Sequence, residues 1–267
     1  TYGLGELILE AIKHGAHEIL LGIGGSATND AGMGMAEALG YSFIDTHGHK
    51  LSPIGENLIK VHEIRIPEEQ AFAPITFKVA CDVANPFYGE QGAAKVYARQ
   101  KGASDKDIAF LDDGLKHFAK VVFDQMGIDL QGLKGAGAAG GLGGGTVAFL
   151  NATLVSGIEM IKQIARFDEQ IQGADWIITG EGKLDSQTLS GKTIGGVLGS
   201  AQQKKVKVAA FCGAIELSET QLGHSGLSYT KAISEGTDNL EKAMAQAPEN
   251  LYDAVYHFAQ MLLPRPN

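Results

Sequence analysis

The sequence contains only two cysteines in 267 residues, Cys81 and Cys212. Small secreted domains that rely on disulfides are rich in cysteine, so this class of protein is excluded. Both cysteines lie among apolar neighbours in the sequence. The sequence therefore predicts reduced thiols in a cytoplasmic protein.

Long apolar runs and long basic runs are also missing. No apolar stretch approaches the ~18 residues that a membrane-spanning helix needs. The formal net charge is −9, and Lys and Arg are scattered, which argues against binding to nucleic acid or to an anionic membrane. We therefore expect a small-molecule ligand, and an anionic one would need a local positive site within this acidic chain.

Glycine, by contrast, is abundant, with 36 residues. The chain is long enough for one large or two ordinary domains. From residue 156 onward, predicted helices and strands alternate as in a doubly wound α/β sheet. Its first element is a helix, so this sheet needs strands from elsewhere. We expect two α/β domains, one over residues 1–155 and one, lacking its N-terminal strands, over residues 156–267.

The segment 174–193 has a dense group of polar residues directly after a predicted strand. Residues 176–178 are apolar and predict a short buried strand that stops at residues 179–180. Ligands of open α/β sheets bind beyond the carboxyl ends of the strands. The alternative is a solvated polar loop. The polar side chains are those of Glu181, Lys183, Asp185, Ser186, Gln187, Thr188 and Lys192.

Two nucleotide-binding signatures nearly fit the sequence. Residues 191–193 resemble the end of a phosphate-binding P-loop, but Ser186 occupies the position of its first glycine. Residues 135–140 spell a dinucleotide fingerprint, but no convincing strand precedes them. A nicotinamide-dependent dehydrogenase is therefore disfavoured.

A second polar group follows the predicted strand 19–23. It forms a turn before a helix of small residues at 31–39, an arrangement that directs backbone N–H groups at an anion. An Asx-capped helix with ordinary turn glycines explains the same pattern, and both interpretations stay open. The residues concerned are Gly24, Gly25, Ser26, Thr28, Asn29 and Asp30.

Three further segments are candidates for contact with a ligand. Asp82 and Asn85 follow the predicted strand 75–80 and precede a proline. The loop 88–103 carries cations, including Lys101, that either meet phosphate or are solvated. Residues 135–145 contain seven glycines, among them Gly140 and Gly141, and form either a flexible linker or a close backbone approach.

The remaining segments predict ordinary packing elements. Ser104 with Asp107, and Ser156 with Glu159, match the capping box at a helix start. The first predicts a helix that ends at Gly127, and the second predicts one that continues through Phe167. The other expectations are a hairpin over 41–52, helices over 193–203 and 251–263, and strands over 206–211 and near 227–233.

Four segments together resemble the type-1 glycerate kinase family of bacteria. They are GGSATND at 24–30, CDVANP at 81–86, the glycine-rich segment 135–145, and TGEGKLDSQT at 179–188. The resemblance implies ATP-dependent phosphorylation of D-glycerate, giving 2-phosphoglycerate, with ATP and Mg²⁺ as cofactors. It also implies a flavodoxin- or Rossmann-like domain and a smaller inserted α/β domain.

Members of this family begin with a further segment that this sequence lacks, and the chain opens at Thr1 rather than at methionine. We therefore expect a truncated form whose own kinase activity is in question. The alternative function is a non-catalytic α/β module that binds a nucleotide or another anion. The oligomeric state is not predicted.

Phosphoryl transfer requires an oriented nucleophile and neutralisation of oxygen charge. Asp185 and Glu181 are the candidate metal ligands and, with Asp82 and Lys192, the candidate catalytic residues. We expect the motifs to converge in one cleft. The candidate substrate- and phosphate-binding residues are Gly24, Gly25, Ser26, Thr28, Asn29, Asp30, Asn85, Gly140, Gly141, Lys183 and Thr188.

Overall fold

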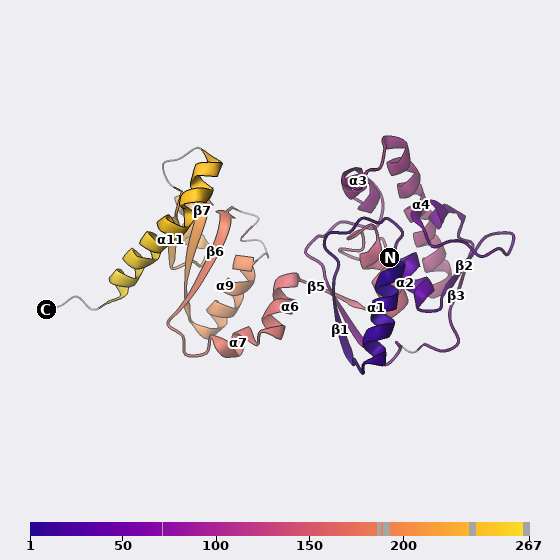
Figure 1. Ribbon diagram of the computed structural model, residues 1–267, viewed down its shortest axis with the longest axis horizontal. Helices are drawn as coiled ribbons and strands as arrows, with labels where there is room; N and C mark the ends of the chain where they lie inside the picture. Colours follow the sequence, from indigo (N-terminus) through magenta and orange to yellow (C-terminus); the bar gives the residue numbers. More distant parts are fainter. Residues whose placement is uncertain (71, 186–187, 189–192, 235–238, 264–267) are drawn as a thin grey trace. The chain divides into compact units, whose positions relative to one another are not determined.

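The computed structural model describes residues 1–70, 72–185, 188, 193–234 and 239–263. The chain divides into two compact units, unit 1 over Thr1–Gly157 and unit 2 over Ile158–Asn267. Both combine helices with parallel strands (Figure 1), which confirms the predicted α/β class.

Unit 1 is built from short strands between helices. Its elements are α1 (Tyr2–Lys13), β1 (Glu18–Gly22), α2 (Met33–Ala38), β2 (Ser42–Ile44), η1 (Gly55–Lys60), β3 (Glu63–Arg65), β4 (Thr76–Ala80), α3 (Ala93–Tyr97), η2 (Arg99–Lys101), α4 (Asp105–Met126), α5 (Leu142–Leu150) and β5 (Thr153–Val155).

The main sheet of unit 1 is parallel, with strand order β1-β4-β5. Gly22 pairs with Ala80, and Ala80 pairs with Val155. All three strands therefore end at the same edge. The segments that follow them, from residues 23, 81 and 156, start side by side at this edge.

The core of unit 1 lies around α4 and α5. Phe43, Phe118 and Phe149 are buried and contact one another, with ring centroids 5.8–6.3 Å apart. The helix α4 begins at the predicted capping box of Ser104 and Asp107 and ends at Gly127, so this prediction is confirmed.

The predicted hairpin over 41–52 is present, and its first strand also pairs with a second, distant strand. The strand β2 pairs antiparallel with β3, so that Phe43 faces Ile64. The local hairpin is held by the hydrogen bonds from Asp45 N to His49 O at 2.9 Å and from Leu51 N to Phe43 O at 2.8 Å, and Ile44 forms an antiparallel bridge with Lys50. Burial explains the additional pairing, because it places the apolar side chains of β2 and β3 together in the core.

The glycine-rich segment 135–145 is a close backbone approach rather than a linker. A Cβ placed on Gly140 would lie 2.1 Å from the carbonyl oxygen of Thr28, and one on Gly145 would lie 2.1 Å from that of Ala31. Gly140 also has a φ of 71°, which favours glycine. The segment therefore packs directly on the turn that follows β1.

Unit 2 contains one parallel sheet with strand order β6-β7-β8. Its elements are α6, which begins at the boundary (Gly157–Ile164), α7 (Phe167–Gln170), β6 (Trp176–Leu184), α9 (Thr193–Lys204), β7 (Lys207–Ile215), α10 (Glu219–His224), β8 (Tyr229–Ala232) and α11 (Leu240–Leu262).

Helices cover both faces of this sheet (Figure 1). In β7, Val208 packs with residues of α9, while Phe211 packs with Phe258 of α11. This alternation follows from the two-residue period of a strand. It explains why β7 reads as a continuous apolar run.

Three predicted boundaries in unit 2 are wrong. The strand β6 continues to Leu184, because it pairs with β7 as far as Ile215. The helix predicted through Phe167 is interrupted at Arg166, which has a φ of 50°. The last helix begins already at Leu240, where the Asn239 side chain accepts a hydrogen bond from Lys242 N at 2.9 Å.

Candidate active site

A cavity of about 460 Å³ lies at the strand-end edge of the unit 1 sheet. We call it the strand-end cavity. The segments after β1 and β4, far apart in the sequence, both contribute to it. Four of the predicted site residues line it, namely Gly24, Gly25, Ser26 and Asp82.

Asp82 presents an exposed carboxylate to this cavity. Its Oδ1 accepts hydrogen bonds from the backbone N–H of Gly157 at 2.8 Å and from the hydroxyl of Ser156 at 3.2 Å. Both donors follow β5. Its Oδ2 receives no hydrogen bond from any described residue, so this oxygen is available to a ligand.

Lys101 is the only cation among the described residues that line the strand-end cavity. It lies at the end of η2, and its Nζ donates to the carbonyl oxygen of Thr28 at 2.6 Å. Burial lowers the pKa of the ammonium group, and the nearby charge of Asp30 partly opposes this effect. A partly desolvated ammonium group is a strong donor to an anion.

Lys101 also lines a second cavity of about 330 Å³, together with Thr28 and Asn29. The side-chain amide of Asn29 is buried and has no hydrogen-bond partner among the described residues. Buried polar groups in proteins nearly always have a partner. The turn after β1 thus separates two cavities that share one lysine.

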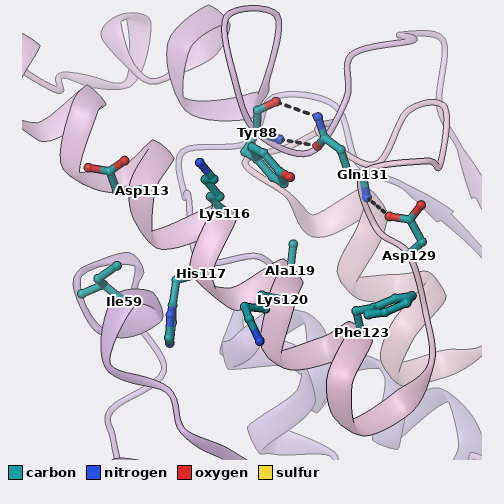
Figure 2. Close-up of a pocket in the computed structure, with 10 residues that line it drawn as sticks. All are labelled: Ile59, Tyr88, Asp113, Lys116, His117, Ala119, Lys120, Phe123, Asp129 and Gln131. Atoms are coloured by element: carbon teal, nitrogen blue, oxygen red, sulfur yellow. Dashed lines mark hydrogen bonds between the residues drawn. The ribbon is translucent and has the colours of Figure 1, made fainter.

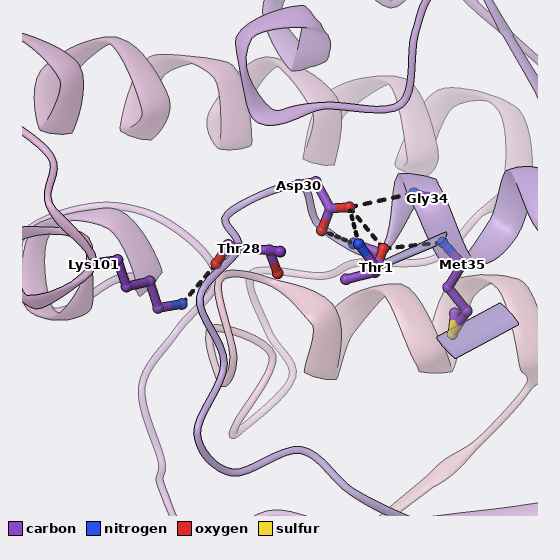
Figure 3. A network of polar contacts seen from close by, with 7 residues as sticks. Thr1, Thr28, Asp30, Gly34, Met35 and Lys101 are labelled. Atoms are coloured by element: carbon purple, nitrogen blue, oxygen red, sulfur yellow. Dashed lines mark hydrogen bonds and ion pairs between the residues drawn. The ribbon is translucent and has the colours of Figure 1, made fainter. Parts of the chain in front are cut away.

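Asp30 is buried in unit 1 and lines neither of these cavities; Figure 3 shows its polar contacts. It is 4% exposed, and its carboxylate accepts hydrogen bonds from the backbone N–H groups of Gly32 and Gly34 and from the Thr1 hydroxyl. The Thr1 hydroxyl in turn accepts from Met35 N at 2.9 Å. These contacts fasten the start of α2 to the start of α1.

Three other predicted residues of unit 1 do not line the strand-end cavity but contact residues packed around it. Asn85 accepts a hydrogen bond from the hydroxyl of Tyr97, which lines the strand-end cavity, at 2.7 Å. Gly140 accepts from Ala31 N at 3.1 Å. A Cβ on Gly141 would lie 3.0 Å from side-chain atoms of Leu115 and Phe87.

The predicted residues of unit 2 contact one another. Lys183 Nζ lies 2.8 Å from Glu216 and 3.8 Å from Asp185, and the hydrogen bond to Glu216 raises the pKa of Lys183. The Asp185 carboxylate accepts from Thr188 N at 2.9 Å and from the Thr188 hydroxyl at 3.0 Å. The Thr188 hydroxyl is therefore held within this group.

Glu181 lies within β6, opposite Cys212 of β7, rather than in a loop. Lys192, Ser186 and Gln187 lie outside the described residues.

A larger cavity than these two, about 760 Å³, lies elsewhere in unit 1 along α4 (Figure 2). Its cations, Lys116 and Lys120, are exposed side chains of that helix, and Lys120 pairs with Asp124. None of the predicted site residues that the structure describes lines it. Its size therefore does not make it the stronger candidate.

The described part of the chain lacks two features. It contains no group of three or more His, Cys, Asp or Glu side chains that could together hold a metal ion. No helix in it is long and apolar enough to cross a membrane.

Sequence reasoning did not select Lys101 and Tyr97 as site residues. Lys101 is one of several cations in the predicted loop, and its charge alone does not distinguish it from its exposed neighbours. The signal lay in spacing, because Tyr97 and Lys101 are four residues apart in a helical stretch and share one face.

Strand-end motifs and a tightly packed glycine-rich segment define an α/β protein whose strand-end cavity has one lysine and one aspartate among the described residues that line it. The sequence pattern of the glycerate kinase family matches residues 1–263, and the chain belongs to this family. This confirms the resemblance drawn from the four motifs.

The chain is also similar to individual proteins that are named glycerate kinases. The glycerate kinase of Halalkalibacterium halodurans is 40% identical over 97% of this chain and 68% of its own length. The glycerate 2-kinase of Escherichia coli is 37% identical, again over 97% of this chain and 68% of its own. A crystal structure from Salmonella typhimurium LT2, provisionally named glycerate kinase 2, has a TM-score of 0.79 at 35% identity and covers 98% of this chain and 70% of its own. The chain thus spans about two thirds of the length of these relatives.

Proposed function

We propose that this chain takes part in the transfer of a phosphoryl group from ATP to D-glycerate, giving 2-phosphoglycerate. Membership of the glycerate kinase family supports the reaction class, and the name of the Escherichia coli relative supports the position that is phosphorylated. The observation that carries the proposal is the strand-end cavity, in which one cation, Lys101, and one carboxylate, Asp82, line the same small space.

The two charged groups suit the two ends of a hydroxy acid. D-Glycerate carries a carboxylate, which Lys101 and the backbone N–H groups of residues 24–26 would bind. Asp82 would accept the proton of the reacting hydroxyl group through Oδ2, while Oδ1 stays bonded to Gly157 and Ser156.

Magnesium fits the residues that are present. Mg²⁺ in phosphoryl-transfer sites binds one or two carboxylates together with phosphate oxygens and water, so a cluster of three protein ligands is not required. Asp185 and Glu181 are the proposed ligands, and Lys192 the proposed phosphate contact. The ion, when bound, neutralises the charge that spreads over the transferred phosphoryl oxygens.

The two thiols are consistent with a cytoplasmic protein, which is part of the proposal. Cys81 and Cys212 are both free. Burial raises the pKa of each thiol, so both are mainly protonated at neutral pH and unreactive.

The proposal is tested by measuring ATP consumption by the full chain with and without D-glycerate. We expect turnover only when D-glycerate is present. Lys101→Met should raise the KM for D-glycerate about tenfold or more, with a smaller change in the KM for ATP. Lys116→Met, in the cavity along α4, is the matched control and should change neither constant.

The pH dependence sharpens this test. Lys101 binds an anion only in its charged form, and its pKa is lowered, so affinity for D-glycerate should begin to fall at a lower pH than an ordinary lysine would give. This alkaline loss should be absent in Lys101→Met. Binding of ATP and D-glycerate without any turnover, measured by calorimetry, would instead establish a non-catalytic module.

A further inference from the structure

The helical stretch α3–η2 carries two side chains into the strand-end cavity. Tyr97 ends α3 and Lys101 ends η2, and both line the cavity. Because they are four residues apart in one helical stretch, they lie on the same side of it. An interaction that holds the Tyr97 side chain in place therefore also restrains the backbone from which the Lys101 side chain extends.

The Tyr97 hydroxyl links this stretch to the segment after β4. It donates to Oδ1 of Asn85 at 2.7 Å, and Nδ2 of Asn85 donates to the carbonyl oxygen of Gln91 at 2.8 Å. The carbonyl oxygen of Asn85 accepts from Gly137 N at 3.0 Å. Asn85 thus ties both ends of α3 to the glycine-rich segment.

Lys101 needs such support for two reasons. Its ammonium group is partly buried, so it would gain hydration by moving outward. Its long side chain also loses conformational freedom when it is held in one place. The hydrogen bond from its Nζ to the carbonyl oxygen of Thr28 keeps it at the cavity, and that bond requires η2 to keep its position.

We propose that Tyr97 is a positioning residue, whose hydrogen bond to Asn85 holds the Lys101 ammonium group at the strand-end cavity for the anionic end of the substrate. The identity of the substrate rests on the function proposed above. Tyr97 acts through Lys101 and not on the reacting atoms. Burial raises the pKa of Tyr97, so its hydroxyl group remains a donor across the neutral range.

The first experiment needs no substrate. The side-chain pKa of Lys101 is measured by NMR on lysine-labelled full chain, in the wild type and in Tyr97→Phe, which removes a single oxygen atom. We expect the lowered pKa to move up toward the ordinary lysine value, because a released ammonium group regains water. Tyr88→Phe, in the cavity along α4, is the matched control and should leave the pKa of Lys101 unchanged. An unchanged pKa in Tyr97→Phe would overturn the inference, whether or not D-glycerate is the substrate.

The second experiment measures kinetics. Tyr97→Phe should raise the KM for D-glycerate about fivefold to tenfold, with kcat and the KM for ATP changed less than about twofold. In a Lys101→Met background, adding Tyr97→Phe should have no further effect on the KM, because the effect passes through Lys101. Additive effects, or equal losses for both substrates, would show a general structural role instead. A wild-type chain that never phosphorylates D-glycerate would refute the proposed function alone, and the pKa measurement would still decide the inference.

Discussion

The carboxyl ends of the two parallel sheets use their polar residues differently. In unit 1, β1 and β4 stop, and the segments that follow them surround a cavity with one cation and one partly unsatisfied carboxylate. In unit 2, β6 continues through the polar segment, and Lys183 pairs with Glu216 beyond the end of β7. Polar residues near a strand end thus line a cavity where the strand stops, whereas in the described part of unit 2 they bond mainly to one another.

The same contrast separates two aspartates within unit 1. Asp30 is buried and accepts several hydrogen bonds from backbone and hydroxyl donors. Asp82 is exposed, and one of its oxygens receives no hydrogen bond from a described residue. Asp30 therefore stabilises the turn on which the cavity is built, while Asp82 is free to meet a ligand.

The largest effect is expected from Gly140→Ala, which changes the glycine-rich segment that packs on the turn after β1 in unit 1. The new Cβ would clash with the carbonyl oxygen of Thr28 and would strain a residue with a positive φ. We expect the free energy of unfolding to fall by about 3 kcal/mol or more, as measured by urea denaturation.

The control for Gly140→Ala is Gly199→Ala in α9, where an added Cβ meets nothing within 4 Å. That change should instead stabilise the helix by about 0.5–1 kcal/mol. If both variants have the same free energy of unfolding, a Cβ at Gly140 does not clash with Thr28 and the argument from close approach is wrong.

The next largest effect separates the two aspartates. Asp82→Asn should lower kcat about 100-fold, because an amide cannot accept the substrate proton, while the free energy of unfolding changes by less than about 0.5 kcal/mol. Asp30→Asn should cost about 2 kcal/mol of stability, since the amide cannot accept all the hydrogen bonds of the carboxylate. Kinetics and denaturation on both variants test this, and a stable, slow Asp30→Asn would reverse the assignment.

The smallest effect concerns Asp185 in unit 2. Asp185→Ala removes the acceptor for Thr188 N and should cost about 1 kcal/mol, whereas Asp185→Asn keeps a good capping side chain and should cost little. Both should slow turnover if Asp185 binds the metal. A variant pair with equal stability would show that the Thr188 contact does not stabilise the fold, and unchanged turnover would remove Asp185 from the proposed metal ligands.

Local sequence chemistry predicted the elements that depend on neighbours along the chain. The capping box at Ser104, the strand over 75–80 and the helix over 193–203 each have their signal within a few residues, and each is present. The errors arose where distant partners decide. Pairing with β7 extends β6 past Gly180, and burial against Ile64 adds the unpredicted strand β3 to the local hairpin of β2.

The motifs that form the strand-end cavity are separate in the sequence, and no local pattern fixes which of their residues face it. The sequence alone determined the α/β class and the family, because these follow from composition and residue order. Only the tertiary structure shows that the glycine-rich segment 135–145 packs on the turn after β1. Only the tertiary structure decided that Asp30 is buried, that Asp82 is open, and that Lys101 supplies the charge. Those outcomes depend on how three parallel strands align their ends, which is set by long-range hydrogen bonding and core packing.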